Sequence, residues 1–415
     1  MLKLKTKLYK LLRWSEKYTK TDMVYLAKGG FWLTTGQFFA TISAFLLALA
    51  YANFLPKESY GTYKYILSIA MIIGALSLTG LGTTIVRSTS RGFEGVFRTS
   101  FIVNLKWSFL VIVPAFLGSI YYYINDNKTL FISLIIIGLL SPLMQSLSFY
   151  GYFLNGKKEF KTSTIYNIYT ILIPAFSLFL VVIFTDNPIT IILFYFLSSI
   201  FIKTILHLKT LKKYNPNKKI DKNSVKYGKH LSVMNLIGVI SNNLDSILIF
   251  HYIGPIQLAV YSFAKAIPIQ FNFIKKAIKT LSLPKISEKN IDELKKTIPT
   301  KAWKIFLMAS IIVLIYVISA PYIYKLIFPQ YIESVIYSQV LSLFILFFPS
   351  LLFTQTLIAH MKNKELYITS AIIPGIKIVL LFSLLPFYGI WGAIVALLLT
   401  NFLHFIILLY LFKRL

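Results

Sequence analysis

The sequence predicts an all-α integral membrane protein with twelve transmembrane helices, and two observations carry that prediction. Of the 415 residues, 57% are hydrophobic and only 14% are charged, with a mean hydropathy of +0.71, which is more apolar than a water-soluble globular chain. Apolar runs of about 20 residues, long enough to cross the hydrocarbon core of a bilayer, recur along the whole chain. Because a spanning segment must satisfy its backbone hydrogen bonds internally, each run predicts a helix.

The hydropathy pattern places the elements in order. Residues 1–28 carry Leu4, Leu8 and Leu11 at helical spacing with lysines between them, which predicts an amphipathic segment on the cytoplasmic surface of the membrane. The twelve spans are expected near 30–53, 63–86, 103–124, 129–154, 163–185, 188–208, 230–252, 258–283, 302–324, 334–360, 366–386 and 388–412.

A hydrophilic stretch divides the chain into two halves with six expected spans each. We interpret residues 209–229 as a cytoplasmic linker between an N-terminal lobe at 29–208 and a C-terminal lobe at 230–415. The segments NFLPKESYGTYKYILSIA, from Asn53, and HYIGPIQLAVYSFAKAIP, from His251, share a span end, a proline turn, a small residue and a tyrosine two positions on. Since each half has an even number of spans, this similarity predicts a parallel repeat about an axis normal to the membrane.

The placement of charge predicts the orientation of the chain. The net charge of +29 could suggest nucleic acid, but nearly all of the 43 Lys and Arg residues lie in the connections on one side of the expected bundle. Basic connections stay in the cytoplasm, so both termini are expected there and no nucleic-acid partner is expected. The connections on the other side are only a few residues long, which argues against a glycosyltransferase or polymerase with a catalytic outer loop.

Four segments, in order along the chain, resemble a known family. They are NFLPKESYGTYKY in the first outer turn, GLGTTIVR at 80–87, LDSILIFHYIGPIQLAVYSFAK at 244–265 and PFYGIWGAIVA at 386–396. With twelve spans, they resemble the polysaccharide flippases, or Wzx-type O-antigen and capsule flippases, of the multidrug, oligosaccharidyl-lipid and polysaccharide exporter superfamily.

The resemblance implies a MATE-like fold and a specific activity. It implies that the protein moves an undecaprenyl-pyrophosphate-linked oligosaccharide from the inner to the outer leaflet of a bacterial cytoplasmic membrane by alternating access, for envelope polysaccharide biosynthesis. The expected partners are that lipid-linked oligosaccharide, membrane lipids, and a polysaccharide polymerase with its chain-length machinery.

Two charges interrupt apolar runs that meet at a Gly-Pro turn. Asp245 and Lys265 lie at similar depths on the seventh and eighth spans, which a short turn makes antiparallel, so the two side chains are expected to face each other. One interpretation is a structural ion pair that sets the register of the helix hairpin. The other is a transport element, because ionisable residues inside membranes are commonly functional.

Further polar residues suggest a path for an anion. If the eighth span is one helix, Lys265, Asn272, Lys276 and Lys279 share one face within about 40°. A pyrophosphate must cross a region of low dielectric constant, and such a stripe would attract it. The alternative is that Lys276, with Lys275 and Lys279, only marks the cytoplasmic side.

Two other basic residues are candidates for substrate binding. Lys377 lies near the centre of the eleventh span beside Pro374 and Gly375, which break helix regularity as often happens next to a transport pathway. Arg87, at the cytoplasmic mouth, could form bidentate bonds to an incoming phosphate, or could simply retain its loop in the cytoplasm.

The sequence does not indicate an enzyme or a cofactor. It contains no Cys, its five His residues lack ligand spacing, and no paired carboxylates or Gly-rich phosphate loop appear. Coupling to a proton or sodium gradient is possible, and Asp245 is the acid placed to bind either ion.

Two alternatives remain open. A multidrug or cation antiporter of the same superfamily would be favoured by an acidic cavity, whereas the charges expected inside the membrane are mostly positive. A non-transporting scaffold for polysaccharide assembly would not require the charges in the cavity.

Overall fold

The computed structural model describes residues 13, 23–221 and 223–415, and every regular element in these ranges is a helix, which confirms the expected all-α class. Most of the amphipathic segment expected at residues 1–28 lies outside the described residues. The first half of the chain holds α2 (Met23–Phe54), α3 (Lys57–Ala75), α4 (Leu81–Ser90), α5 (Val96–Trp107), α6 (Phe109–Ile124), α7 (Lys128–Leu147), α8 (Phe149–Gly156), α9 (Phe160–Phe184) and α10 (Pro188–Tyr214). The second half holds α11 (Ser224–Tyr252), α12 (Pro255–Ala266), η1 (Pro268–Phe271), α13 (Asn272–Ser287), α14 (Ile291–Ile327), η2 (Pro329–Tyr331), α15 (Ser334–Ser342), η3 (Leu343–Phe347), α16 (Ser350–Ala359) and α17 (Asn363–Lys413).

Nine helical segments in the described ranges are long and apolar enough to cross a membrane. The expected spans at 63–86 and 258–283 are not among these nine because each is interrupted, as α3–α4 and as α12–η1–α13. The last two expected spans correspond to two helical segments that both carry the label α17 and that meet at Gly389, whose backbone is not helical (φ 58°, ψ −133°). Each of the twelve expected ranges is therefore mostly helical, but only nine described segments meet the criterion of length and hydropathy, because two expected spans are interrupted and two fall in one segment.

The interruptions recur at matching places in the two halves. The second span of each half is broken, between α3 and α4 and at η1, and the fourth is broken between α7 and α8 and at η3. At η1 the cause is local, because Pro268 has no backbone N–H to donate into the preceding turn. The break between α5 and α6 at Ser108 has no counterpart in α14.

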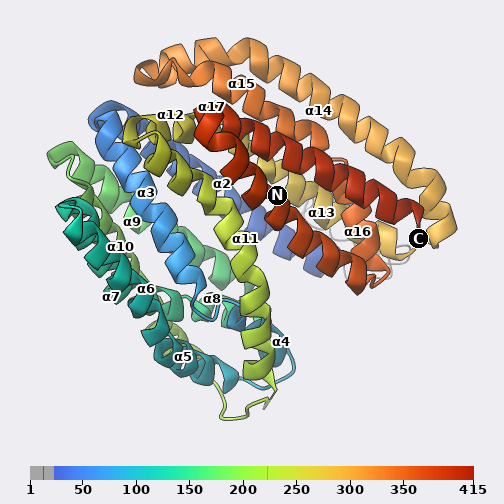
Figure 1. Ribbon diagram of the computed structural model, residues 1–415. Coiled ribbons are helices and arrows are strands. Elements are labelled where there is room, and N and C mark those ends of the chain that lie inside the picture. Colours follow the sequence, from blue (N-terminus) through green and yellow to red (C-terminus); the bar gives the residue numbers. More distant parts are fainter. Residues whose placement is uncertain (1–12, 14–22, 222) are drawn as a thin grey trace, which may run out of the picture.

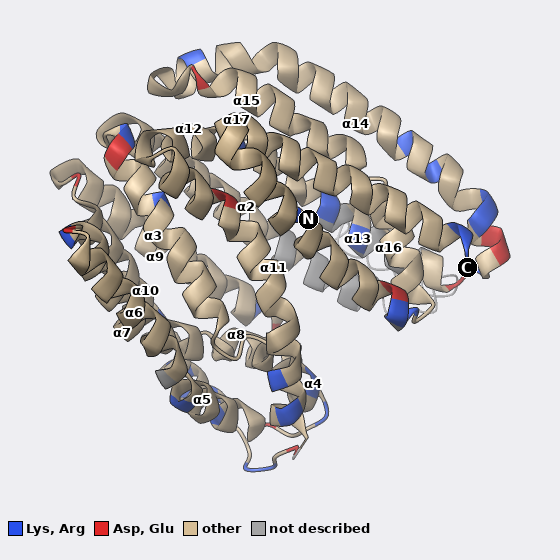
Figure 2. Cartoon of the chain, viewed as in Figure 1, with Lys and Arg blue, Asp and Glu red and all other residues tan. Residues whose placement is uncertain are grey.

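The two halves meet at one end and diverge toward the other (Figure 1). We call the end that holds the starts of α3 and α12 the apex, and the end that holds the C-termini of α4 and α10 the basic end. Lys and Arg residues concentrate away from the apex (Figure 2). Apart from α11, the main contacts between the halves join α3 to α12 and α2 to η2, and both lie near the apex.

Close packing holds the apex together. A Cβ atom on Gly61 would lie 1.8 Å from the carbonyl oxygen of Pro255, so only glycine allows α3 to approach α12 this closely. The ring of Tyr65 stacks on Phe250 with a centroid distance of 3.9 Å. Lys57 forms an ion pair with Glu333 across the two halves.

Helix α11 contacts both halves. At the basic end, Gly80 at the start of α4 donates its N–H to the hydroxyl of Ser232 at 2.9 Å. Farther along, α11 packs against α3, α12 and α17. The non-helical connection before α11, described at residues 215–221, lies against the first half, where the N–H of Gly95 donates to the carbonyl of Lys219 at 2.9 Å.

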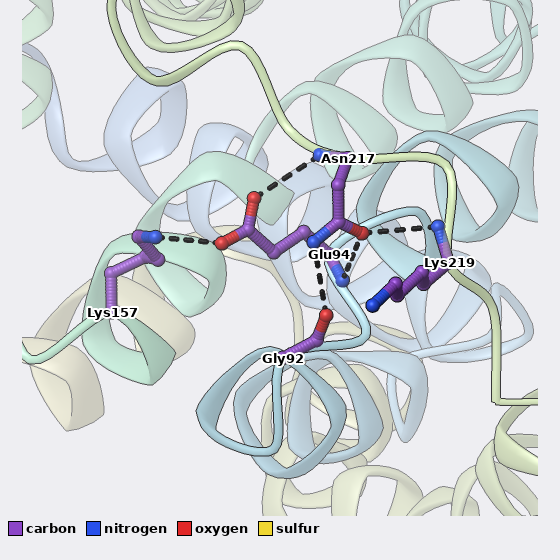
Figure 3. A network of polar contacts seen from close by, with 5 residues as sticks. All are labelled: Gly92, Glu94, Lys157, Asn217 and Lys219. Atoms are coloured by element: carbon purple, nitrogen blue, oxygen red, sulfur yellow. Dashed lines mark hydrogen bonds and ion pairs between the residues drawn. The ribbon is translucent and has the colours of Figure 1, made fainter.

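A polar network fixes this connection (Figure 3). Glu94 accepts hydrogen bonds from the ammonium group of Lys157 at 2.6 Å and from the backbone N–H of Asn217 at 3.1 Å. The side-chain amide of Asn217 donates to the carbonyl of Gly92 at 3.0 Å. The connection is thus bound to the loop between α4 and α5.

Large apolar side chains cover much of the outer surface. Phe184 and Leu326 are each 84% exposed, and long runs of α6, α9 and α14 expose Leu, Ile and Phe residues in the same way. Exposing so much apolar surface to water would be unfavourable, whereas contact with lipid tails is not. The protein is therefore a multi-pass membrane protein.

Candidate functional site

Asp245 and Lys265 form the ion pair that the sequence predicts. The ammonium nitrogen of Lys265 lies 2.8 Å from Oδ2 of Asp245, and the hydroxyl of Tyr261 donates to the same oxygen at 2.7 Å. The backbone N–H of Ser246 donates to Oδ1 at 2.9 Å. Asp245 is 1% exposed, whereas the Lys265 side chain keeps 26% of its surface exposed, so the lysine is the accessible member of the pair.

Lys265 opens into a cavity of about 490 Å³ in the second half of the chain. The cavity volume falls in the range of about 300–1,000 Å³ typical of small-molecule sites. Its polar lining comes from α11, α12, α13 and α17 and consists of Ser241, Asn242, Lys265, Asn272, Lys275, Lys377, Thr400 and Asn401. Three of these side chains are basic and none is acidic.

Two of the three cavity cations lie near Asp245, the one buried carboxylate among the described residues. Lys377, on α17, lies close enough to Asp245 and Lys265 for their charges to interact. Lys265 also lies over the ring of Tyr261, 4.8 Å from its centroid. Asp245 can neutralise only one of these ammonium groups, so the site retains a net positive charge.

Lys64 is a residue that the sequence interpretation missed. It lies on α3 in the first half, its ammonium group lies 5.5 Å from the centroid of the Tyr60 ring, and its charge interacts with that of Lys265. The internal repeat does not indicate it, because the alignment of Tyr63 with Tyr261 places Lys64 opposite Ser262 rather than Lys265. The first half of the chain therefore adds a cation beside the pair.

The expected stripe along the eighth span rests on an uninterrupted helix, and that assumption was wrong. Four residues of η1 turn by about 120° each rather than about 100°, which rotates α13 by about 80°, close to one residue position. Lys275 therefore lines the same cavity as Lys265, together with Asn272, which is also on α13. The side chain of Lys276 lies outside the described residues, and Lys279 is exposed and does not line the cavity.

Arg87 lies apart from this cavity. It is an exposed residue of the last turn of α4, and its guanidinium group lies 5.7 Å from the centroid of the Tyr227 ring at the start of α11. The structure thus brings together Asp245, Lys265, Asn272 and Lys377 of the expected site, but not Arg87.

Comparison with known proteins places these features in a family. The family model described as polysaccharide biosynthesis protein matches residues 26–278, which is more than half of the chain. No curated protein matches the sequence.

Solved structures share the fold at low sequence identity. An inward-facing multidrug resistance transporter of the MATE family in the MOP superfamily is 12% identical, with a TM-score of 0.70 over 89% of this chain and 94% of that chain. An outward-facing transporter of the same description is 11% identical, with a TM-score of 0.61 over 93% and 95%. The MATE multidrug transporter DinF-BH is 15% identical, with a TM-score of 0.64 over 92% and 95%. The chain therefore belongs to the polysaccharide biosynthesis protein family and has the fold of the MATE transporters of the MOP superfamily.

Proposed function

We propose that the protein is a flippase that moves an undecaprenyl-pyrophosphate-linked oligosaccharide from the inner to the outer leaflet of the cytoplasmic membrane by alternating access. It acts as a transporter without enzymatic activity and supplies envelope polysaccharide biosynthesis. The observation that carries the proposal is the second-half cavity, which is lined by three lysines and no carboxylate. Membership of the polysaccharide biosynthesis family supports the same substrate class.

The chemistry of the cavity fits the charged part of such a substrate. A pyrophosphate diester carries negative charge into a region of low dielectric constant, where its attraction to ammonium groups is much stronger than in water. Lys265 and Lys377 would contact the phosphates, Lys275 would meet them on entry from the basic end, and Asn272 would donate hydrogen bonds. The lipid tail would remain in the bilayer.

Asp245 offers a way to couple transport to an ion gradient. In the structure its carboxylate competes with any incoming anion for Lys265. Binding of a proton or a sodium ion to Asp245 would weaken that competition and free Lys265 for the substrate. Release of the ion would restore the pair and expel the phosphates.

The arrangement of the halves supports loading from the basic end. The apex is closed by the contact of Gly61 with Pro255 and by the Lys57–Glu333 pair. The basic end, which the positive-inside rule assigns to the cytoplasm, is where the two halves diverge. Rocking of the halves would then expose the cavity at the apex.

Complementation tests the proposal. In a strain deleted for this gene, wild type should restore surface polysaccharide, and Lys265→Ala and Lys377→Ala should each reduce it strongly at equal membrane abundance. Lys279→Ala, an exposed lysine of α13, is the matched control and should behave as wild type. Full surface polysaccharide from the Lys265→Ala/Lys377→Ala double variant would overturn the proposal. If Lys265→Ala loses surface polysaccharide but Asp245→Asn/Lys265→Ala regains it, the pair is structural and the substrate is held elsewhere.

A multidrug or cation antiporter predicts the opposite charge preference. The solved neighbours are multidrug transporters, which is the observation that keeps this alternative. The excess of lysine in the cavity would repel a cationic drug. Everted vesicles expose the cytoplasmic side of the membrane, so export of a cationic dye is measured as uptake into the vesicles. Dye uptake with wild type that is lost in Asp245→Asn would favour the antiporter.

A further inference from the structure

A second cavity, of about 420 Å³, lies in the first half of the chain. Its walls come from α2, α8 with Ser148 just before it, the first three turns of α9, and α10. Ser163 is only the fourth residue of α9, which places the cavity in the basic half of this lobe. It contains no residue of the lysine-rich cavity described above.

Neutral hydrogen-bonding groups dominate the lining of this second cavity. Hydroxyl groups come from Ser148, Ser163, Thr164 and Thr170, and amides from Asn155 and Asn167. Oδ1 of Asn155 is buried without a hydrogen-bond partner in the described part of the chain. A buried amide oxygen without a donor is costly, so it marks a place where a ligand hydroxyl could donate.

A single cation faces this neutral lining. Lys203, on α10, is the only charged residue among the described residues that line the cavity. Burial removes much of the water around its ammonium group, and no described Asp or Glu forms an ion pair with it. An unpaired ammonium group with little water favours an anionic partner.

Aromatic rings complete the lining. Tyr150 and Tyr152 contribute to the wall of the cavity, and their rings offer apolar surface with polar edges. Hydroxyls, amides and tyrosine rings are groups suited to a sugar, which presents C–H faces and many hydroxyls. One lysine among them suits a single carboxylate.

We propose that the cavity around Lys203 binds an acidic sugar, a saccharide unit that bears one carboxylate. The inference rests on the proposed function, because it assigns the pyrophosphate to the three-lysine cavity of the second half and the saccharide to the first. The contrast in lining supports this division, since one cavity offers three cations and the other offers one cation among neutral donors and acceptors.

Saccharide binding to the purified full-length protein in nanodiscs tests the assignment. The probes are cellobiuronic acid, which carries one carboxylate, and cellobiose, its neutral counterpart. Saturation-transfer NMR detects binding of each disaccharide, and titration with the disaccharide gives its affinity. Wild type should bind the acidic disaccharide about tenfold more tightly than the neutral one, the size expected when one hydrogen bond becomes charge-assisted. Lys203→Gln should abolish that preference, and Lys203→Arg should keep it.

The controls separate this inference from the proposed function. Lys265→Ala should leave the preference for the acidic disaccharide unchanged, even if it abolishes transport. An equal affinity for both disaccharides, a preference that survives in Lys203→Gln, or no saturation transfer to either sugar would overturn the inference. Binding of inorganic phosphate that depends on Lys203 and is as tight as that of the acidic disaccharide would also overturn it, in favour of a general anion site. None of these outcomes affects the complementation result for the lysine-rich cavity.

Discussion

At the scale of the residue, the Asp245–Lys265 pair shows how one charge is kept in a membrane interior. Both oxygens of Asp245 accept hydrogen bonds, from Lys265 and Tyr261 on one side and from the N–H of Ser246 on the other. The carboxylate is fully enclosed, whereas the lysine still reaches the cavity. The same contact therefore joins the two helices of the hairpin and leaves a cation at the cavity wall, so the structural and the transport interpretations do not exclude each other.

Removing one partner should cost more stability than removing both. Lys265→Met leaves Asp245 buried without its counter-ion, and we expect a loss of about 1–3 kcal/mol in the free energy of unfolding. In Asp245→Asn/Lys265→Met no uncompensated charge remains, so most of that loss should be recovered. Thermal unfolding of the purified variants in detergent measures this. A double variant no more stable than Lys265→Met would contradict the pairing.

At the scale of the element, interruptions and short connections decide where side chains point. The turn of η1 at Pro268 rotates Lys275 into the cavity, and the non-helical backbone at Gly389 separates the two helical segments of α17. The connection before α11 is tied to the first half through Glu94 and Asn217. The connection leads directly into α11, the helix that carries Asp245.

The Glu94 network predicts a pH dependence at the basic end. Burial alone would raise the pKa of Glu94, but hydrogen bonds from Lys157 and from the backbone of Asn217 outweigh it and lower the pKa below its usual value. A lowered pKa means that the carboxylate stabilises the folded connection above its ordinary titration range, and that this contribution is lost as the pH falls through the lowered value. Near neutral pH, Glu94→Gln should therefore speed hydrogen exchange at the amide of Asn217.

The matched control is Glu293→Gln, which removes the exposed i,i+4 partner of Lys289 and should leave exchange at Asn217 unchanged. The difference between wild type and Glu94→Gln should shrink in acid, once Glu94 itself is protonated. A difference that persisted in strong acid would show that the carboxylate charge is not what holds the connection.

At the scale of the whole molecule, the two halves touch at the apex and separate toward the basic end. The Lys57–Glu333 pair lies across that contact, with Lys57 also 5.5 Å from the centroid of the Tyr331 ring. Both partners of this pair are partly exposed, so it biases the position of the halves without locking it. Such a weak contact suits the proposed alternating access, in which this boundary opens in each cycle.

Reversing one charge at the apex should favour its opening. Glu333→Lys places two cations together, and an exposed pair of this kind contributes about 0.2–1 kcal/mol, which corresponds to a shift of up to about fivefold between closed and open states. Because the chain has no Cys, spin labels on Glu58→Cys and Gln330→Cys can report the distance by pulsed electron paramagnetic resonance. The charge swap Lys57→Glu/Glu333→Lys should restore the closed population, and an unchanged distance distribution in Glu333→Lys would refute the role of the pair.

The sequence by itself determined the class of protein, the places of the spans and the central ion pair. Hydropathy depends on local composition, so long apolar runs identify helices without knowledge of their neighbours. The pairing of Asp245 with Lys265 was also predictable, because a short Gly-Pro turn forces adjacent helices to be antiparallel and so aligns residues at equal depth.

Only the tertiary structure decided what surrounds that pair. Lys64 and Lys377 come from helices far apart in the sequence, and no periodicity specifies which helices pack together. The presence of Lys275 on the cavity wall, where Lys276 was expected, depends on a change of helix type over a few residues, which hydropathy does not register. The first-half cavity around Lys203 arises where four separate helices leave space between them, and that space exists only once packing has placed their side chains.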